Sequence, residues 1–221
     1  MKMQYHPDDA TLLGFANATL ERNFAVLVAC HLRHCPRCRQ RLRQAEQLGA
    51  ELMQRLQPAE VSADCKQALF DRLDESTKLD PAERSATVTA QQHEPLIPAL
   101  LQHWPEQDFD TVPWKRIAPG IQQHKIDLGS SNLSLLRIAP GTCMPSHGHE
   151  GSELTMILRG SYSDEIGRFQ PGDVADLDDE IEHQPIADRD EPCICLVATD
   201  APLRFNSWVP RLMQGLVFSF D

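Results

Sequence analysis

The sequence predicts a two-domain α + β protein, in which a helical domain precedes a small antiparallel β-sandwich or barrel. Up to about residue 75, apolar residues recur at intervals of three and four, which is the period of an amphipathic helix. After Trp114, short segments alternate apolar and polar residues between Gly, Pro and Asp turns. The stretch between these regions is rich in Ser, Thr, Gln and Pro. We therefore predict a helical domain at residues 1–80, a linker at 81–110 and a β-domain at 111–221.

Four helices are expected in the first domain. The first can begin at the Asp8–Asp9 pair, because aspartate is a favoured N-cap, and a second covers about residues 20–33. A third can begin at Pro36, because the first turn of a helix needs no N–H donor there, and a fourth follows Ser62. The apolar positions expected on one side of the first three helices are Leu12, Leu13, Phe15 and Ala16 as a buried stripe, then Leu20, Phe24, Leu27 and Val28, and then Leu42, Ala45, Leu48, Leu52, Met53 and Leu56. On the fourth helix, Leu69, Phe70 and Leu73 are expected to be exposed or docked.

The second domain is predicted from four segments that carry the two-residue alternation of strands. They lie at residues 125–129, 133–141, 154–177 and 193–205. Turn residues separate them at short intervals, as is typical of a small antiparallel sandwich or barrel.

Charge is distributed unevenly over the 221 residues, whose net charge is -11. Residues 1–85 carry 12 Lys plus Arg against 12 Asp plus Glu, whereas residues 86–221 carry 9 against 20. The acidic second half argues against binding to nucleic acid. DNA binding through the arginine-rich stretch 33–43 is an alternative, although the spacing of its Cys and His residues does not match a zinc finger.

No stretch of the sequence resembles a secretion signal or a membrane span. The longest apolar run, FAVLVAC at residues 24–30, is far shorter than the about 20 residues that a spanning helix needs. We therefore expect a cytoplasmic protein without a membrane partner. In that compartment the seven cysteines are expected to be thiols or metal ligands rather than disulfides.

A first candidate metal motif lies within the predicted β-domain. His147 and His149 are two residues apart, so on a strand they project from the same face. A turn at EGS then brings Glu153 into the next strand. Imidazole and carboxylate ligands suit zinc, iron, manganese or nickel, so the motif predicts a metal site without fixing the metal.

The spacing around these residues is similar to the first motif of the cupin superfamily, whose fold is a small β-barrel with the metal inside. In this chain the motif runs Gly141, five residues, His147-x-His149, three residues, Glu153, six residues and Gly160. A looser form of the second cupin motif follows, with a Pro-Gly-Asp turn at 171–173. The strict form would place its histidine sooner and an asparagine after it, and this chain has neither.

The resemblance to cupins implies a set of four ligands for one metal ion in the barrel. These residues are His147, His149, Glu153 and His183, the last being the match to the histidine of the second motif.

A second cluster lies upstream. His31, Cys35 and Cys38 are spaced i, i+4 and i+7, which places them along one helical face, although Pro36 disfavours a continuous helix. A joint between two helices at this proline would still bring the three side chains together. The N-terminus of a helix favours thiolates, so Cys-x-x-Cys there is a common zinc half-site. His6, just ahead of the first helix, can supply the fourth ligand of a tetrahedral zinc.

The alternative for Cys-Pro-x-Cys is a thioredoxin-like redox pair. That interpretation requires a preceding βαβ pattern, which the sequence lacks, and it leaves His6 and His31 without a role.

The spacing His6-x24-His31-x3-Cys35-x2-Cys38 resembles the zinc-binding anti-sigma domain of many bacterial anti-sigma factors. Together with a C-terminal cupin domain it looks like the ChrR family of anti-sigma factors, and this resemblance covers nearly the whole chain. It implies two zinc ions per chain, a structural one at these four residues and a second one in the cupin domain. The identity of the cupin metal stays open at this point.

The resemblance also implies a function. The helical domain is expected to wrap between the two halves of an extracytoplasmic-function-type sigma factor and to block its access to core RNA polymerase. The cupin domain is expected to be required for the response to singlet oxygen or related oxidants, after which the sigma factor is released. Because cupins often dimerise, a homodimer through the cupin domain is a further expectation.

Cys193 and Cys195 are candidates for a redox or sensing role. They are two residues apart in PCICLV, so on a strand they share a face and can line the barrel interior. A matching pair occurs in the family pattern. The alternative is that both are small buried core residues.

The main alternative function is a metal-dependent cupin enzyme, a dioxygenase or an isomerase, with a fused regulatory zinc domain. Iron or manganese on the same four ligands could support such chemistry. Nothing in the sequence indicates a substrate pocket or a separate acid or base, so we predict a protein that is not an enzyme.

Overall fold

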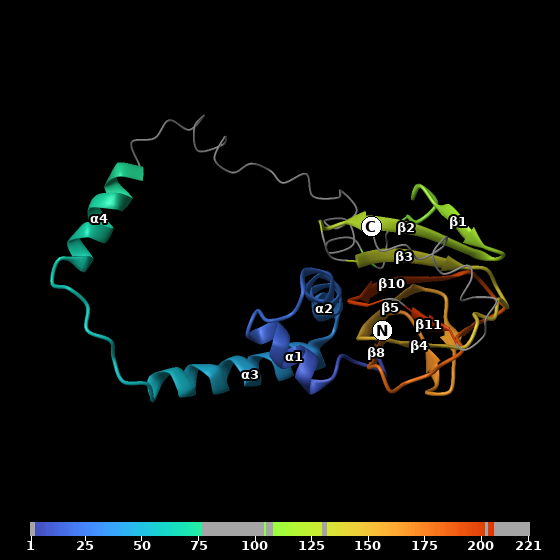
Figure 1. Cartoon of the computed structure of the whole chain (residues 1–221), viewed down its shortest axis with the longest axis horizontal. Helices are drawn as coiled ribbons and strands as arrows, with labels where there is room; N and C mark the ends of the chain where they lie inside the picture. The colour runs from blue at the N-terminus through green and yellow to red at the C-terminus, as the bar shows by residue number, and fades with distance from the viewer. Residues whose placement is uncertain (1–2, 77–103, 105–107, 130–131, 202, 206–221) are drawn as a thin grey trace. The chain divides into compact units, whose positions relative to one another are not determined.

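The predicted order of four helices followed by an antiparallel β-domain is confirmed in the computed structural model (Figure 1). The structure describes residues 3–76, 104, 108–129, 132–201 and 203–205. The predicted linker, 81–110, lies almost entirely outside these residues.

The helices are α1 (Asp9–Ala16), α2 (Arg22–His34), α3 (Pro36–Gln54) and α4 (Cys65–Ser76). The strands are β1 (Lys115–Ala118), β2 (Ile121–Asp127), β3 (Asn132–Ile138), β4 (His147–His149), β5 (Glu153–Arg159), β6 (Tyr162–Ser163), β7 (Arg168–Phe169), β8 (Val174–Leu177), β9 (Ile186–Ala187), β10 (Cys193–Thr199) and β11 (Leu203–Phe205).

The chain forms two compact units. One comprises Met1–Gln47 together with Glu94–Asp221, and the other comprises Leu48–His93. The first unit therefore holds α1, α2, the start of α3 and all the described strands. These units reflect packing, and the domain boundaries at residues 80 and 110 stay a prediction from the sequence.

Capping and proline residues set the ends of the first three helices. Asp8 caps α1, because its carboxylate accepts a hydrogen bond of 2.6 Å from the N–H of Thr11. α2 ends at His34 and α3 begins at Pro36, as the sequence predicts. Cys35 between them has an extended backbone (φ −100°, ψ 102°), which is the region that a residue before proline prefers.

The β-domain has two layers of antiparallel strands. Six strands form the larger sheet in the order β1-β2-β3-β10-β5-β8. β7-β6-β9 and β4-β11 form two smaller sheets. A bridge between His147 and His183 joins β4 to the segment before β9, so that residues far apart in the chain meet in the barrel.

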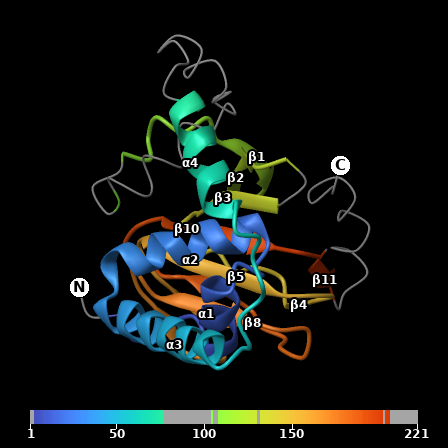
Figure 2. The same ribbon diagram turned by 90° about the vertical axis from the view of Figure 1, so that its left-hand side faces the viewer.

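α2 lies across β5 and β10 (Figure 2). Leu27 and Val28 share one buried apolar cluster with Leu154 and Met156. The following residue, Ile157, belongs instead to the cluster in the barrel interior. β5 and β10 are therefore buried on both faces over six consecutive residues each. The prediction that apolar and polar residues alternate along these two strands is wrong, because α2 covers the face of the sheet that would otherwise meet solvent.

A buried asparagine fixes α2 on this sheet. Asn23 is fully buried, and its side-chain amide donates hydrogen bonds of 2.9 Å to the carbonyls of Asn132 and Thr199. Each carbonyl belongs to an end of β3 or β10, so α2 is placed by directional bonds as well as by apolar packing.

None of the helices in the described part of the chain is long and apolar enough to cross a membrane.

Candidate metal centres

The four upstream candidates meet at the joint between α2 and α3. Nδ1 of His6 lies 3.4 Å from Nε2 of His31 and 3.4 Å from Sγ of both Cys35 and Cys38. Nε2 of His31 lies 3.2 Å from Sγ of Cys38. All four candidate ligand atoms lie within 4.8 Å of one another.

These distances fit a tetrahedral zinc ion. Bonds of about 2.0 Å to nitrogen and about 2.3 Å to sulfur place the ligand atoms of a tetrahedron about 3.3 to 3.8 Å apart. The separations of 3.4 Å lie at the short end of this range, and the separation of 3.2 Å lies just below it. Two imidazoles and two thiols are also a common donor set of structural zinc sites.

The local sequence produces this geometry. His31 lies in the last turn of α2, Cys35 lies at the joint, and Cys38 lies in the first turn of α3. The N–H of Cys38 points at Sγ of Cys35, 3.4 Å away, as expected for a thiolate at a helix N-terminus. These three side chains are buried and His6 is partly buried, so the cluster is closed to solvent on most sides.

Burial sets the protonation of this cluster. It lowers the pKa of His31 to about 4, against a smaller opposing contribution from the Gly172 carbonyl. Burial, followed by the neighbouring Cys35, raises the pKa of the Cys38 thiol to about 12. Burial and then Arg37 lower the pKa of His6. At pH 7 His31 is thus ready to bind a metal as a neutral imidazole, whereas Cys38 must lose a proton.

The tautomer of His31 follows from its second hydrogen bond. Nδ1 lies 2.9 Å from the carbonyl oxygen of Gly172, in the barrel. Because a carbonyl can only accept, Nδ1 carries the proton and Nε2 keeps its lone pair towards the cysteines. This is the outer support that metal-binding histidines usually have.

The barrel cluster is partly assembled. Nε2 of His147 and Nε2 of His183 face each other at 3.1 Å. Nδ1 of His147 donates to the carbonyl of Pro145 (2.8 Å), and Nδ1 of His183 donates to a carboxylate oxygen of Asp164 (3.0 Å). Both histidines therefore direct Nε2 to the same point, and as neutral imidazoles they would present two lone pairs there, an arrangement that suits a shared cation.

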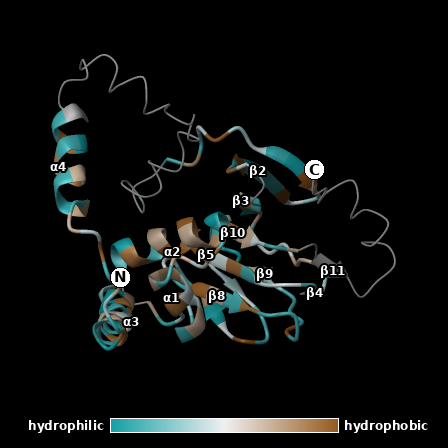
Figure 3. Ribbon diagram, turned by 60° about the vertical axis from the view of Figure 1, so that its left-hand side comes forward, coloured by the Kyte–Doolittle hydropathy of each residue, from teal (hydrophilic) through white to brown (hydrophobic). Residues whose placement is uncertain are grey.

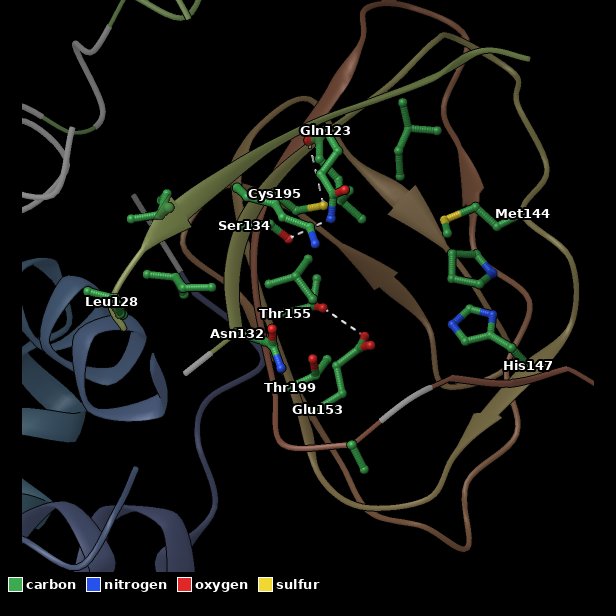
Figure 4. Close-up of a pocket in the computed structure, with 18 of the residues that line it drawn as sticks. Gln123, Leu128, Asn132, Ser134, Met144, His147, Glu153, Thr155, Cys195 and Thr199 are labelled. Atoms are coloured by element: carbon green, nitrogen blue, oxygen red, sulfur yellow. Dashed lines mark hydrogen bonds between the residues drawn. The ribbon is translucent and has the colours of Figure 1, made fainter. Parts of the chain in front are cut away.

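The other two candidates of this cluster are less closely placed. Glu153 and His147 project into the barrel interior from different sides, and Glu153 accepts a hydrogen bond of 2.8 Å from the Thr155 hydroxyl (Figure 4). Glu153, His147 and His183 line one cavity of about 290 Å³. The backbone of His149 pairs with Leu203 between β4 and β11, and its side chain lies outside the described part.

Asp164 is a functional candidate that sequence reasoning did not select. Burial acts to raise its pKa, but the hydrogen bond from His183 and those from the backbone N–H groups of Gly167 and Ile166 outweigh burial, so the net pKa is lowered. An ionised carboxylate here orients His183. The only signal in the sequence is an acidic residue in a turn, SDEIG, which is too common to identify a site.

Cys193 and Cys195 share the interior face of β10, as predicted, and both belong to the interior apolar cluster. Only Cys195 of the two lines the described cavity. A hydrogen bond with Cys193, then burial, raises the pKa of Cys195 well above its usual value. Reactive cysteines have low pKa values and are exposed, so Cys195 has the character of an inert core thiol, and Cys193 is as deeply buried beside it.

Fold and sites together define a protein in which a helical region with a candidate Cys/His metal site is joined to a cupin-type barrel. Comparisons with known proteins agree with both parts. Residues 106–202 match the ChrR cupin-like domain family. The anti-sigma-E factor ChrR of Cereibacter sphaeroides is 37% identical over 97% of this chain and 98% of its own length. The chain therefore belongs to the ChrR family of anti-sigma factors.

A solved structure supports the same assignment. The crystal structure of Rhodobacter sphaeroides SigE in complex with the anti-sigma ChrR matches with 34% identity and a TM-score of 0.67. The match covers 90% of this chain and 100% of the matched chain. Because its relative is a regulator, the chain is not an enzyme, and the alternative of a cupin oxygenase or isomerase is not supported.

Proposed function

We propose that this protein sequesters an extracytoplasmic-function-type sigma factor through its helical region, and releases it when the barrel responds to singlet oxygen or related oxidants. The near-full-length similarity to an anti-sigma-E factor and to a chain solved with SigE supports this proposal. In this proposal His6, His31, Cys35 and Cys38 hold a structural zinc. His147, His149, Glu153 and His183 hold a second metal ion.

The observation that carries the partner proposal is the absence of a core in the described part of the second unit. Every described side chain from Leu48 to Asp74 is exposed. The large apolar ones with about half or more of their surface exposed are Leu48, Leu52, Met53, Leu56, Val61, Leu69, Phe70 and Leu73.

Such a segment is poorly stabilised by itself. Isolated helices shorter than about 12 to 15 residues are marginal in water, and α4 has 12 residues. Leu69, Phe70 and Leu73 are spaced to give α4 one apolar side, and hydrophobic and hydrophilic residues alternate along it (Figure 3). An amphipathic helix of this kind typically completes its packing in the groove of a partner protein.

The zinc at the helix joint would act structurally. It would cross-link the segment before α1, the end of α2 and the start of α3. It would add to the hydrogen bonds that Arg39 donates to the carbonyls of Leu32 and Arg33, and that Arg41 donates to the carbonyl of Pro7. Metal binding of this type contributes directly to folding, so the position of α3 would depend on it.

The barrel site would supply the response. Zinc with nitrogen and oxygen ligands has no redox change of its own, so an oxidant must alter a ligand or a nearby side chain. Met144 and Cys195 line the same cavity as His147 and Glu153 (Figure 4). Oxidation of the thioether to a sulfoxide would introduce a polar group into this interior.

The proposal is tested with tagged protein expressed in its native cells. We expect one sigma factor to co-purify in a one-to-one complex, identified by mass spectrometry. The double change Leu69→Asp and Leu73→Asp should abolish capture, because it places charge on the apolar side of α4. Gln67→Ala, on an exposed side chain of the same helix, should leave capture intact. Equal capture by the double variant would contradict the assigned surface.

The response is tested separately on the purified complex. Illumination with a photosensitiser that generates singlet oxygen should release the sigma factor. Illumination without oxygen is the control. Retention of the sigma factor under both conditions would leave the anti-sigma role standing and would refute the proposed stimulus.

A further inference from the structure

The segment that carries His6 is attached to the barrel. The N–H groups of Gln4 and Tyr5 donate hydrogen bonds of 2.6 and 3.1 Å to one carboxylate oxygen of Asp173, just before β8. The N–H of Val174 in turn donates to the carbonyl of Tyr5 (3.2 Å). Asp173 is 2% exposed, so these bonds are shielded from water. The backbone next to His6 is therefore fixed by the barrel.

The same turn also orients a second candidate ligand, His31 of α2. The carbonyl of Gly172 accepts the 2.9 Å hydrogen bond from Nδ1 of His31, and both groups are buried. Gly172 has a φ of +92°, a conformation that glycine adopts readily and other residues rarely adopt. Its own N–H donates to the carbonyl of Ile157 in β5 (2.8 Å). The direction of this carbonyl is thus set by the strand beside it.

Two consecutive barrel residues therefore position two of the four candidate ligands. We propose that the turn Pro171–Asp173 is an integral outer part of the helical metal site, with Gly172 orienting His31 and Asp173 placing His6. The proposal rests on the metal site proposed above. It follows that the helical region retains its metal only while this turn of the barrel keeps its conformation.

The turn is also connected to the barrel's own cluster. β5 begins at Glu153, and four residues later Ile157 exchanges backbone hydrogen bonds with Gly172 and Asp173. An aromatic series adds a second connection, because the ring of Tyr5 lies 4.3 Å from Phe169, which stacks at 4.9 Å on Tyr162. Tyr162 lines the cavity that also contains Glu153. A distortion at the barrel site thus has a short, continuous path to His6 and His31.

Cobalt substitution gives a test that reports on the helical site alone. Co(II) bound by Cys35 and Cys38 has thiolate charge-transfer absorption, whereas Co(II) on the histidines and carboxylate of the barrel has none. The measurement is the rate at which this absorption decays in the full chain after excess EDTA is added. Asp173→Ala should accelerate the decay by about 10- to 100-fold, the range typical for loss of an outer-shell partner.

Asp176→Ala is the matched control. Asp176 lies in β8, and its carboxylate accepts a hydrogen bond of 2.9 Å from the N–H of Asp8, so it also joins the helical region to the barrel. Its carboxylate contacts the start of α1 and not the backbone beside His6 or the ring of His31. Its decay rate should stay within about twofold of that of the unchanged protein. An equal acceleration in both variants would show a general docking effect and would overturn the proposal.

A second variant keeps the test decisive if Asp173→Ala fails to fold, as judged by circular dichroism. Tyr5→Ala removes the ring contact with Phe169 from outside the barrel fold, and should also accelerate cobalt loss. An unchanged rate in a folded Asp173→Ala protein, or in Tyr5→Ala when the former does not fold, refutes the proposal. Absence of thiolate charge transfer in the unchanged protein would instead refute the metal site itself.

Discussion

The two candidate metal clusters differ in how the chain assembles them. At the helix joint, three of the four side chains come from residues 31–38, and all four ligand atoms lie within 4.8 Å of one another. In the barrel, the candidates come from residues 147–183 on separate strands and turns. There the two described histidines face each other, but Glu153 is hydrogen-bonded to Thr155 instead. Local spacing brings three of the four joint residues together, whereas a site built by strand pairing needs the barrel for every one of its residues.

The largest effect should come from removing one ligand of each cluster. We expect Cys38→Ser to weaken binding at the joint by more than about 100-fold, beyond the usual effect of an outer-shell change, and to reduce the thiolate charge transfer of any cobalt still bound there to the contribution of Cys35. His183→Ala should remove the barrel metal and leave the charge transfer present. Metal content by mass spectrometry, with optical spectra, distinguishes the two losses. If either change emptied both sites, the clusters would not be separable in this way.

The thiols of the two regions should differ in native reactivity. Cys65 and Cys143 are exposed and should be alkylated by iodoacetamide first. Cys35 and Cys38 should react only after a chelator removes the metal, because a bound thiolate is not free to attack. The measurement is peptide mass spectrometry over time. Alkylation of Cys35 and Cys38 at equal rates with and without chelator would speak against their being ligands.

The two barrel cysteines, Cys193 and Cys195, should react more slowly than the exposed thiols. Cys193 and Cys195 are buried in the core, and the pKa of Cys195 is well above its usual value. We expect both to stay unmodified until the protein is unfolded in denaturant, chelator or not. Rapid labelling of either in the folded protein would instead support the sensing role that the sequence suggested.

Sequence reasoning succeeded where contacts are local. The spacing of His31, Cys35 and Cys38, together with Pro36, is sufficient to predict a joint with three converging side chains. The need for a fourth ligand then pointed to His6. The structure places all four together, and zinc binding by them is our proposal.

Reasoning from the sequence failed for contacts between distant segments. His31 meets Gly172 across 141 positions, and Gln4 meets Asp173 across 169, so no periodicity connects them. A signal for the docking of α2 does exist in two segments, CICLVA, which is apolar throughout, and LTMIL, which is apolar except for Thr155. Such runs indicate strands that are buried on both faces. The prediction of alternating apolar and polar residues for these strands did not take this into account.

The pH dependence of metal binding should also separate the clusters. Binding at the joint must displace the proton of Cys38, whose pKa is raised to about 12, whereas His31, with a pKa of about 4, has no proton to lose at neutral pH. Each displaced proton weakens binding tenfold per unit of falling pH. We therefore expect affinity at the joint to fall by at least about tenfold from pH 8 to pH 7.

The barrel set contains no thiol, so its affinity should fall less over this interval. Competition titrations with a chromophoric chelator, on the Cys38→Ser and His183→Ala proteins, measure each site separately. Parallel pH profiles for the two sites would indicate that no thiol proton is displaced at the joint.

The smallest expected effect concerns Glu153, which lies less close to its partner ligands in the barrel than the four joint residues lie to one another. The Thr155 hydroxyl donates to Oε1 of Glu153 at 2.8 Å, and both side chains are buried. If this bond orients the carboxylate for the metal, Thr155→Val should weaken barrel metal binding about tenfold, the lower limit for an outer-shell partner. Thr155→Ser keeps the hydroxyl and should bind as the unchanged protein does. Tighter binding in Thr155→Val would show that the threonine instead holds Glu153 away from the histidines.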